Sequence, residues 1–156
     1  MSKIIEYCTE EVNRQGHDTS KLDGLWRVGS MLDAWCFALL QDWRVPKLEI
    51  IQTLGTKIEP FHNMNGFRGV GVRIGIRNCP KPEDITVLLE RLISLWPMSP
   101  LEFYKEFELI HPFVDGNGRT GKIILNGLNG TLLDPIFPPA NLFKDVPYAL
   151  ENQKAV

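Results

Sequence analysis

The sequence predicts one mainly α-helical domain that carries a single β-hairpin. Over most of its 156 residues, apolar side chains recur at intervals of three and four, which is the helical period. One short segment alternates residue by residue instead, as a strand does. Helical and strand-like segments do not alternate along the chain, so a parallel α/β sheet is not expected. The length suffices for one hydrophobic core.

Three helices are expected in the first part of the chain. Residues 3–14 form a modest amphipathic segment. A stronger helix has Asp23 as its capping residue, and its apolar and aromatic positions continue to Trp43. Pro46 suits the first turn of a third helix, which we expect to end at Gly55.

The alternating segment runs from Phe67 to Arg77 and predicts an extended strand. Asn65-Gly66 just before it is a turn dipeptide that could be the tip of a hairpin or the entry to it. Glycine and arginine fill one face of the strand. Its other face is apolar: Val70, Val72, Ile74 and Ile76.

Three more helices are expected after the strand. Prolines 80 and 82 introduce a helix over residues 83–95. Ser99 and Pro100 start the next one, which ends near His111 because a proline follows. Another begins near Gly118 and continues to residue 128, and the proline-rich tail after residue 134 leaves room for only a short helix.

Composition excludes several classes of protein. A net charge of −2 with interspersed signs indicates no broad nucleic-acid surface. The apolar stretches are too short to cross a membrane, and the N-terminus lacks a signal-peptide pattern. Cys8, Cys36 and Cys79 have neither disulfide-framework nor metal-ligand spacing. We therefore expect a cytoplasmic protein without nucleic-acid or membrane partners.

The segment from His111 to Lys122 concentrates the chemistry. Gly116, Asn117 and Gly118 lie where a helix begins, so their N–H groups form an anion site. Arg119 and Lys122 are three residues apart on that helix and can both point toward a polyphosphate.

A base and a metal ligand accompany this anion site. Asp115 is a hard oxygen ligand suited to Mg²⁺ shared with phosphate oxygens. The pKa of a histidine such as His111 suits a general base near neutral pH. Together these groups predict phosphoryl or nucleotidyl transfer. His17 and His62 are expected to be structural or solvated, with His62 at most a contact for a target.

A P-loop overlaps the same residues but fits poorly. Gly116, Gly121 and Lys122 have the right spacing, yet Ile123 stands where the pattern needs Ser or Thr for Mg²⁺. A P-loop also needs a preceding strand in an α/β fold, which this chain is not expected to have.

The string His-Pro-Phe-x-Asp-Gly-Asn-Gly-Arg at residues 111–119 resembles the signature of the Fic family, within the Fic/Doc superfamily, at every specified position. Residues 66–76 resemble the family's flap, and the exit at Pro80 and Pro82 also fits. The similarity covers roughly residues 66–139, and residues 1–60 match only as generic N-terminal helices. We treat residues 1–156 as a single Fic domain.

The resemblance implies a Fic-like helical bundle with a β-hairpin flap over the active site. It implies a protein adenylyltransferase that moves AMP from Mg-ATP to a hydroxyl of a target protein. His111 would deprotonate that Ser, Thr or Tyr hydroxyl, and Asp115 would bind the Mg²⁺. The loop amides with Asn117 would hold the phosphates, and Arg119 would neutralise them. An extended target segment would pair with the flap: Val70, Gly71, Val72, Arg73 and Ile74.

Two departures from the family leave alternatives open. Lys122 stands where arginine is usual and loses the bidentate fork, so another phosphodonor, or a catalytically weak binding module, remains an alternative. No complete inhibitory string Ser/Thr-x-x-x-Glu-Gly/Asn is present, since Tyr7 and Arg91 follow the nearest two candidates. A separate antitoxin-like protein remains an open possibility.

Overall fold

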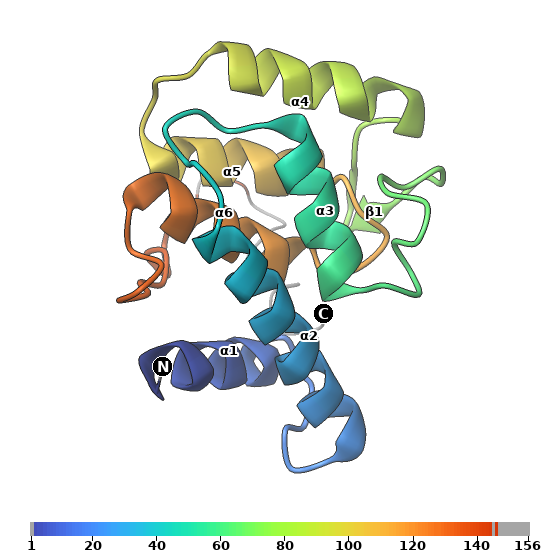
Figure 1. Ribbon diagram of the computed structural model, residues 1–156. Coiled ribbons are helices and arrows are strands. Elements are labelled where there is room, and N and C mark those ends of the chain that lie inside the picture. Colours follow the sequence, from blue (N-terminus) through green and yellow to red (C-terminus); the bar gives the residue numbers. More distant parts are fainter. Residues whose placement is uncertain (1, 145, 147–156) are drawn as a thin grey trace.

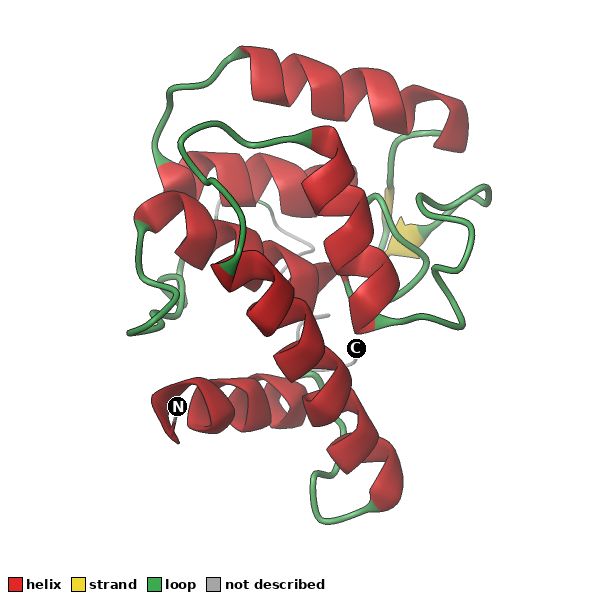
Figure 2. Cartoon of the chain, in the orientation of Figure 1, coloured by secondary structure: helices red, strands yellow, loops and turns green. Residues whose placement is uncertain are grey.

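A computed structural model describes residues 2–144 and 146, and its described part is mainly helical with one small hairpin (Figures 1 and 2). The prediction of a mainly α fold with a β-hairpin is therefore confirmed. The helices are α1 (Ser2–Arg14), α2 (Leu22–Leu39), α3 (Leu48–Ile58), η1 (Pro82–Asp84), α4 (Ile85–Ser94), α5 (Pro100–Ile110) and α6 (Asn117–Asn129). The strands are β1 (Arg73–Ile74) and β2 (Arg77–Asn78).

Helix α6 runs through the middle of the molecule. Nearly all of its residues up to Gly127 are buried, because α2, α3 and α5 pack around it. Helix α1 lies against α2 at one end of the molecule, and α4 lies over α5 at the other (Figure 1). The anion loop thus opens the most enclosed helix of the fold, which holds its geometry firmly.

Two expected helix boundaries were wrong, one of them for a packing reason. Gly55 does not end α3 but lies inside it. A Cβ at this position would lie 2.1 Å from the ring of Phe113, so the glycine admits that ring against the helix. Helix α2 ends at Leu39, and Asp23 is not its cap but lies in its first turn, where it accepts a hydrogen bond from Arg27.

The prediction of one long strand from Phe67 to Arg77 was also wrong. β1 and β2 contain two residues each, paired Arg73 with Asn78 and Ile74 with Arg77. The tip is at Gly75, whose φ of 58° turns the chain back, and not at Asn65-Gly66. The hairpin is anchored to the end of α5, because Arg77 Nη1 donates to the carbonyl of Leu109 at 2.9 Å.

No helix in the part of the chain that the structure describes is long and apolar enough to span a membrane. The three cysteines are unpaired, with Cys8 and Cys79 buried and Cys36 exposed. From residue 135 to residue 144 the described chain forms turns and irregular segments. A short helix was expected somewhere after residue 134; residues 135–144 and 146 contain none, and the other positions of the tail lie outside the described residues.

Candidate active site

His111 lies at the end of α5 in a left-handed conformation, with φ of 52° and ψ of 62°. This conformation is uncommon outside glycine and is found where the surroundings enforce it. Burial, and after it the charge of the Arg68 guanidinium, lower the pKa of His111 from its ordinary value to about 4, and the backbone of Glu108 opposes them only in part. The imidazole is therefore neutral near pH 7, as a general base must be.

Arg68 holds the histidine's backbone in place. Its Nε donates to the carbonyl of His111 at 2.7 Å, and the side chain is almost fully buried. Nη1 donates to the carbonyl of Val70 at 2.8 Å, and Nη2 donates to the carbonyl of Pro80 at 2.7 Å. One guanidinium therefore joins both ends of the hairpin segment to His111. The backbone N–H of Arg68 also donates to Pro112 at 2.9 Å.

The loop after His111 is closed by Asn117. Its side-chain amide donates to the carbonyl of Phe113 at 3.0 Å and accepts from the N–H of Phe113 at 2.9 Å. The side chain of Asn117 therefore shapes the loop, and what it can offer a phosphate is its backbone N–H. Gly116 has φ of 78°, and a Cβ there would lie 2.5 Å from Ile58, so the position requires glycine.

The start of α6 provides unpaired backbone donors. The first backbone bond of the helix runs from the N–H of Thr120 to the carbonyl of Gly116 at 2.9 Å. The N–H groups of residues 117–119 precede it and have no partner within the helix. Unpaired N–H groups at a helix start make an anion site, and these follow the base His111 by only a few residues in the chain.

Asp115 lies in the chain between His111 and these donors. Its Oδ1 accepts from the N–H of Gly116 at 2.7 Å. Its Oδ2 lies 3.6 Å from Arg27 Nη1 and 3.8 Å from His62 Nδ1, beyond hydrogen-bond distance. The carboxylate is 29% exposed, so Oδ2 keeps lone pairs for a hard cation. Glu59, His62 and Asp115 also form a possible metal-binding group among the described residues.

The two cations of the motif point to different partners. Arg119 Nη2 lies 2.6 Å from Oε1 of Glu59 on one side of α6. Lys122 Nζ lies 2.8 Å from Oε1 of Glu11 in α1, on another side. Each cation is thus paired with a buried glutamate, and the expectation that both can point toward one polyphosphate stays a prediction.

A further buried acid lies near Lys122. Glu108 in α5 is packed against Gly121, where a Cβ would lie 2.2 Å from its Oε1. Burial raises the pKa of Glu108 to about 7, and Lys122 lowers it by less. Lys122 therefore lies in a buried group with two carboxyls.

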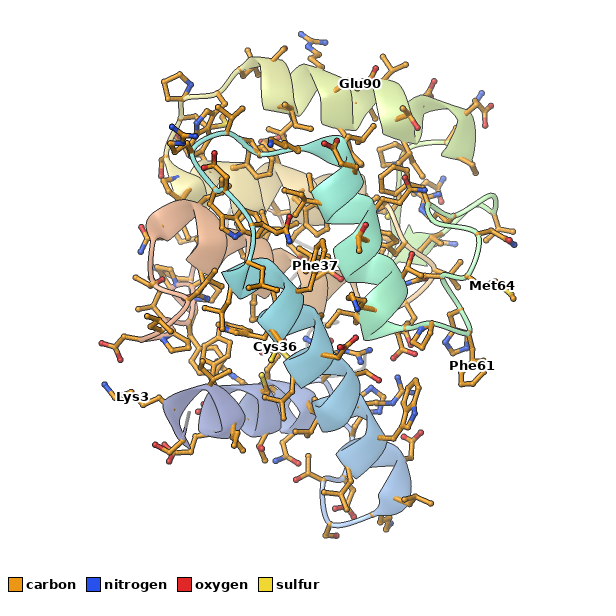
Figure 3. All side chains as sticks on the ribbon, viewed as in Figure 1. Lys3, Cys36, Phe37, Phe61, Met64 and Glu90 are labelled. Carbon is orange, nitrogen blue, oxygen red and sulfur yellow. The ribbon has the colours of Figure 1, made fainter. Side chains whose placement is uncertain are left out.

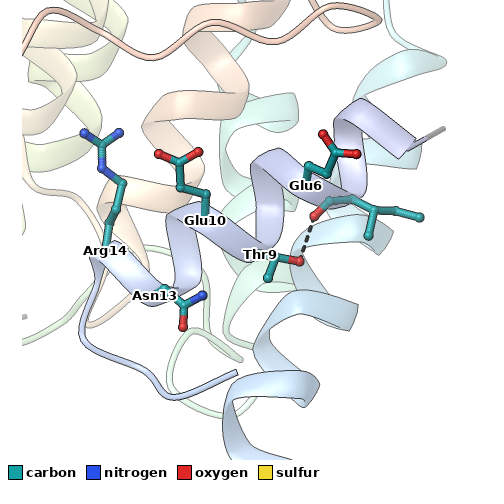
Figure 4. Close-up of a pocket in the computed structure, with 6 residues that line it drawn as sticks. Glu6, Thr9, Glu10, Asn13 and Arg14 are labelled. Atoms are coloured by element: carbon teal, nitrogen blue, oxygen red, sulfur yellow. Dashed lines mark hydrogen bonds between the residues drawn. The ribbon is translucent and has the colours of Figure 1, made fainter. Parts of the chain in front are cut away.

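The predicted flap residues lie beside this site. Val70, Gly71 and Val72 precede the hairpin, and Arg73 and Ile74 form β1. Phe61 and Met64 are strongly exposed on the segment between α3 and the hairpin (Figure 3). A hollow along the outer face of α1 contains none of the predicted site residues (Figure 4).

Residues 48–128, more than half of the chain, match the model of the family described as Fic/DOC. This chain belongs to the Fic/DOC family. The match begins at Leu48 and so includes α3, which sequence reasoning had treated as generic.

Relatives of known name resemble part of the chain. It is 37% identical over 84 residues to "Protein adenylyltransferase Fic" of Drosophila virilis, which covers 47% of this chain and 16% of that protein. It is 35% identical over 85 residues to a probable protein adenylyltransferase of Aquifex aeolicus, covering 46% and 27%. The chain thus corresponds to a minor part of these relatives' lengths.

Solved structures share the fold. A Fic family protein from Desulfovibrio desulfuricans superposes with a TM-score of 0.64 at 16% identity, over 98% of this chain and 54% of that one. Fic-1 from C. elegans gives 0.57 at 19% identity, over 86% and 50%. At these identities the likeness concerns the fold alone.

Sequence reasoning missed several residues around the loop. Glu59, Arg27 and Arg68 all contact predicted site residues or their backbone. His62, expected to be structural or solvated, lies near Asp115. These residues share a charge that is wholly or largely removed from solvent, but burial is not visible in one sequence.

Proposed function

We propose that this chain is a protein adenylyltransferase that moves AMP from Mg-ATP to a Ser, Thr or Tyr hydroxyl of a target protein. The observation that carries the proposal is a neutral, constrained imidazole at His111 that precedes the N-terminus of α6 by a few residues. The names of the relatives agree with it. So does Asp115, the one carboxylate within residues 111–119, whose side chain is partly exposed.

The proposed step follows from these positions. The target hydroxyl oxygen forms a bond to the α-phosphorus, the bond to the β-phosphate oxygen breaks, and the hydroxyl proton goes to the imidazole of His111. The N–H groups of residues 117–119 hold the phosphates. Asp115 Oδ2 would hold Mg²⁺, which when bound neutralises charge on the phosphates and on departing pyrophosphate.

The hairpin is the proposed docking edge for the target. Within the described strands, β1 pairs with β2 on one side only, so its other edge can receive an extended segment. Arg68 and Arg77 hold this edge close to the end of α5, near His111. A separate antitoxin-like inhibitor remains a proposed second partner.

One observation favours the alternatives of a different phosphodonor or a catalytically weak binding module. Lys122 and Arg119 are each paired with a buried glutamate, so both are less available to bind the phosphates of a triphosphate. A donor with fewer phosphates, or binding without turnover, would need fewer cations at the site.

Labelling with several donors separates these functions. The protein is incubated with Mg²⁺ and a lysate of candidate targets, using ATP labelled in the adenine or in the γ-phosphate. Adenine label on protein without γ label supports AMP transfer. The reverse pattern indicates a kinase, label only from another nucleotide indicates another donor, and no label from any donor indicates a binding module.

A further inference from the structure

Four charged groups from four segments meet beneath the anion loop. Glu59, which caps α3, is 1% exposed, and its Oε1 accepts from both Arg27 of α2 and Arg119 of α6. Asp115 is the fourth member. Its oxygens lie 3.6 Å from Arg27 Nη1 and 3.7 Å from Arg119 Nη2.

Each guanidinium is therefore bound to Glu59 and has Asp115 just beyond hydrogen-bond distance, and Arg27 is also bound to Asp23. The Nη2 atom of Arg119 is 2.6 Å from Glu59 but 3.7 Å from Asp115. Arg119 Nε and Nη1 are buried with no partner among the described residues. Without the charge of Glu59, Asp115 would be the nearest carboxylate to Arg119, and an unpaired buried guanidinium is costly.

An arginine on Asp115 would compete with a divalent cation. A guanidinium hydrogen bond occupies carboxylate lone pairs, and its charge repels a second cation at the same oxygen. The structure shows the opposite arrangement, in which both arginines are bound by Glu59 and Asp115 Oδ2 has only long contacts.

We propose that Glu59 is a positioning residue that holds Arg27 and Arg119 off Asp115 and so keeps Oδ2 available to the cation of the phosphodonor. The inference rests on the proposed function for the role of that cation. It extends the site to α2 and the end of α3, beyond the motif, and Arg27 lies outside the segment that matches the family.

The test measures metal-dependent anion binding, which needs no turnover. Calorimetry compares inorganic tripolyphosphate binding with Mg²⁺ and with EDTA, for wild type and for Glu59→Gln. The ratio of the tripolyphosphate affinity with Mg²⁺ to that with EDTA is the Mg²⁺ gain. We expect Glu59→Gln to reduce the Mg²⁺ gain by about tenfold, a usual size for coupling between sites. Binding in EDTA should be equal or tighter, since the variant removes a negative charge.

A matched control is Glu49→Gln, the same change at an exposed position of the same helix. It should leave the Mg²⁺ gain at the wild-type value. Thermal unfolding of each variant checks that the fold is intact. An unchanged Mg²⁺ gain in a folded Glu59→Gln protein overturns the proposal.

Arg27→Gln provides a second, independent variant. It removes one of the two competing cations, so the Mg²⁺ gain should rise. Adding Glu59→Gln to this variant should then lower the Mg²⁺ gain by less than Glu59→Gln does in the wild type. A fall in the Mg²⁺ gain for Arg27→Gln would instead make Arg27 an anion ligand and overturn the proposal. This test remains decisive even if Glu59→Gln does not fold.

Failure of this inference can be told from failure of the proposed function. Wild-type protein that transfers AMP, with Glu59→Gln unchanged in Mg²⁺ gain, refutes the inference alone. Protein with the expected Mg²⁺ gains but no transfer of label from any donor refutes the proposed function alone.

Discussion

Replacing Arg68 by alanine should destabilise the fold strongly and disturb His111 in particular. The guanidinium donates to carbonyls of His111, Val70 and Pro80 at 2.7–2.8 Å, and more weakly to Ile110 at 3.4 Å. Three charge-assisted hydrogen bonds at about 1.5 kcal/mol each give about 4.5 kcal/mol. Relief of the cost of burying a cation offsets part of this, so we expect a net loss of about 3 kcal/mol.

Urea unfolding with linear extrapolation measures this loss. Arg68→Lys keeps the charge but offers one compact donor group in place of a fork, so it should recover only part of the stability. Arg91→Ala, an exposed arginine of α4, is the control and should change stability by less than about 0.5 kcal/mol. If Arg68→Ala matched that control, the guanidinium would not hold the hairpin and His111 together.

Three further predictions concern the core, a cation and the base. Gly55→Ala should destabilise by about 1–3 kcal/mol despite alanine's better helix propensity, because the new Cβ meets Phe113; higher stability in urea would contradict this. Glu11→Gln should release Lys122 and tighten Mg-ATP binding in calorimetry, whereas weaker binding would show that Glu11 orients the lysine for the phosphate. The transfer rate should stay level from pH 8 to about 5 and fall as His111 takes a proton near its pKa of about 4. A transfer rate that already falls by half near pH 6.5 would mean that the pKa of the histidine is not shifted.

The low pKa of His111 also sets the sign of a stability effect. Its pKa in the fold, about 4, is below the ordinary 6.5 of the unfolded chain. The unfolded state therefore binds a proton first as the pH falls, and this group's contribution destabilises the fold progressively between 6.5 and 4.

The parts of the site that sequence could predict are contiguous in the chain. The helix end at His111, the glycines, and the helix start after Gly116 lie within a few residues, so local rules on proline, glycine and helix termini suffice. The helical elements were also predictable, since apolar periodicity reports the buried face of a helix.

The parts that sequence could not predict depend on long-range packing. Arg119 pairs with Glu59, which is 60 residues away along the chain, and Arg68 pairs with His111 across 43 residues. Helical spacing placed Arg119 and Lys122 near one face, but their partners on different helices decide where each side chain points. Gly55 looked like a helix end, because the ring of Phe113 that it accommodates is invisible locally.

We propose His111 as the base for AMP transfer at the α6 loop. The most direct test compares wild type with His111→Ala, following adenine label from ATP onto protein and, in parallel, Mg-ATP binding by calorimetry. We expect transfer to fall by about 10²–10⁴ while Mg-ATP binding is retained, because the loop from Gly116 to Arg119 is intact. Transfer at the wild-type rate in a folded His111→Ala protein would contradict this proposal.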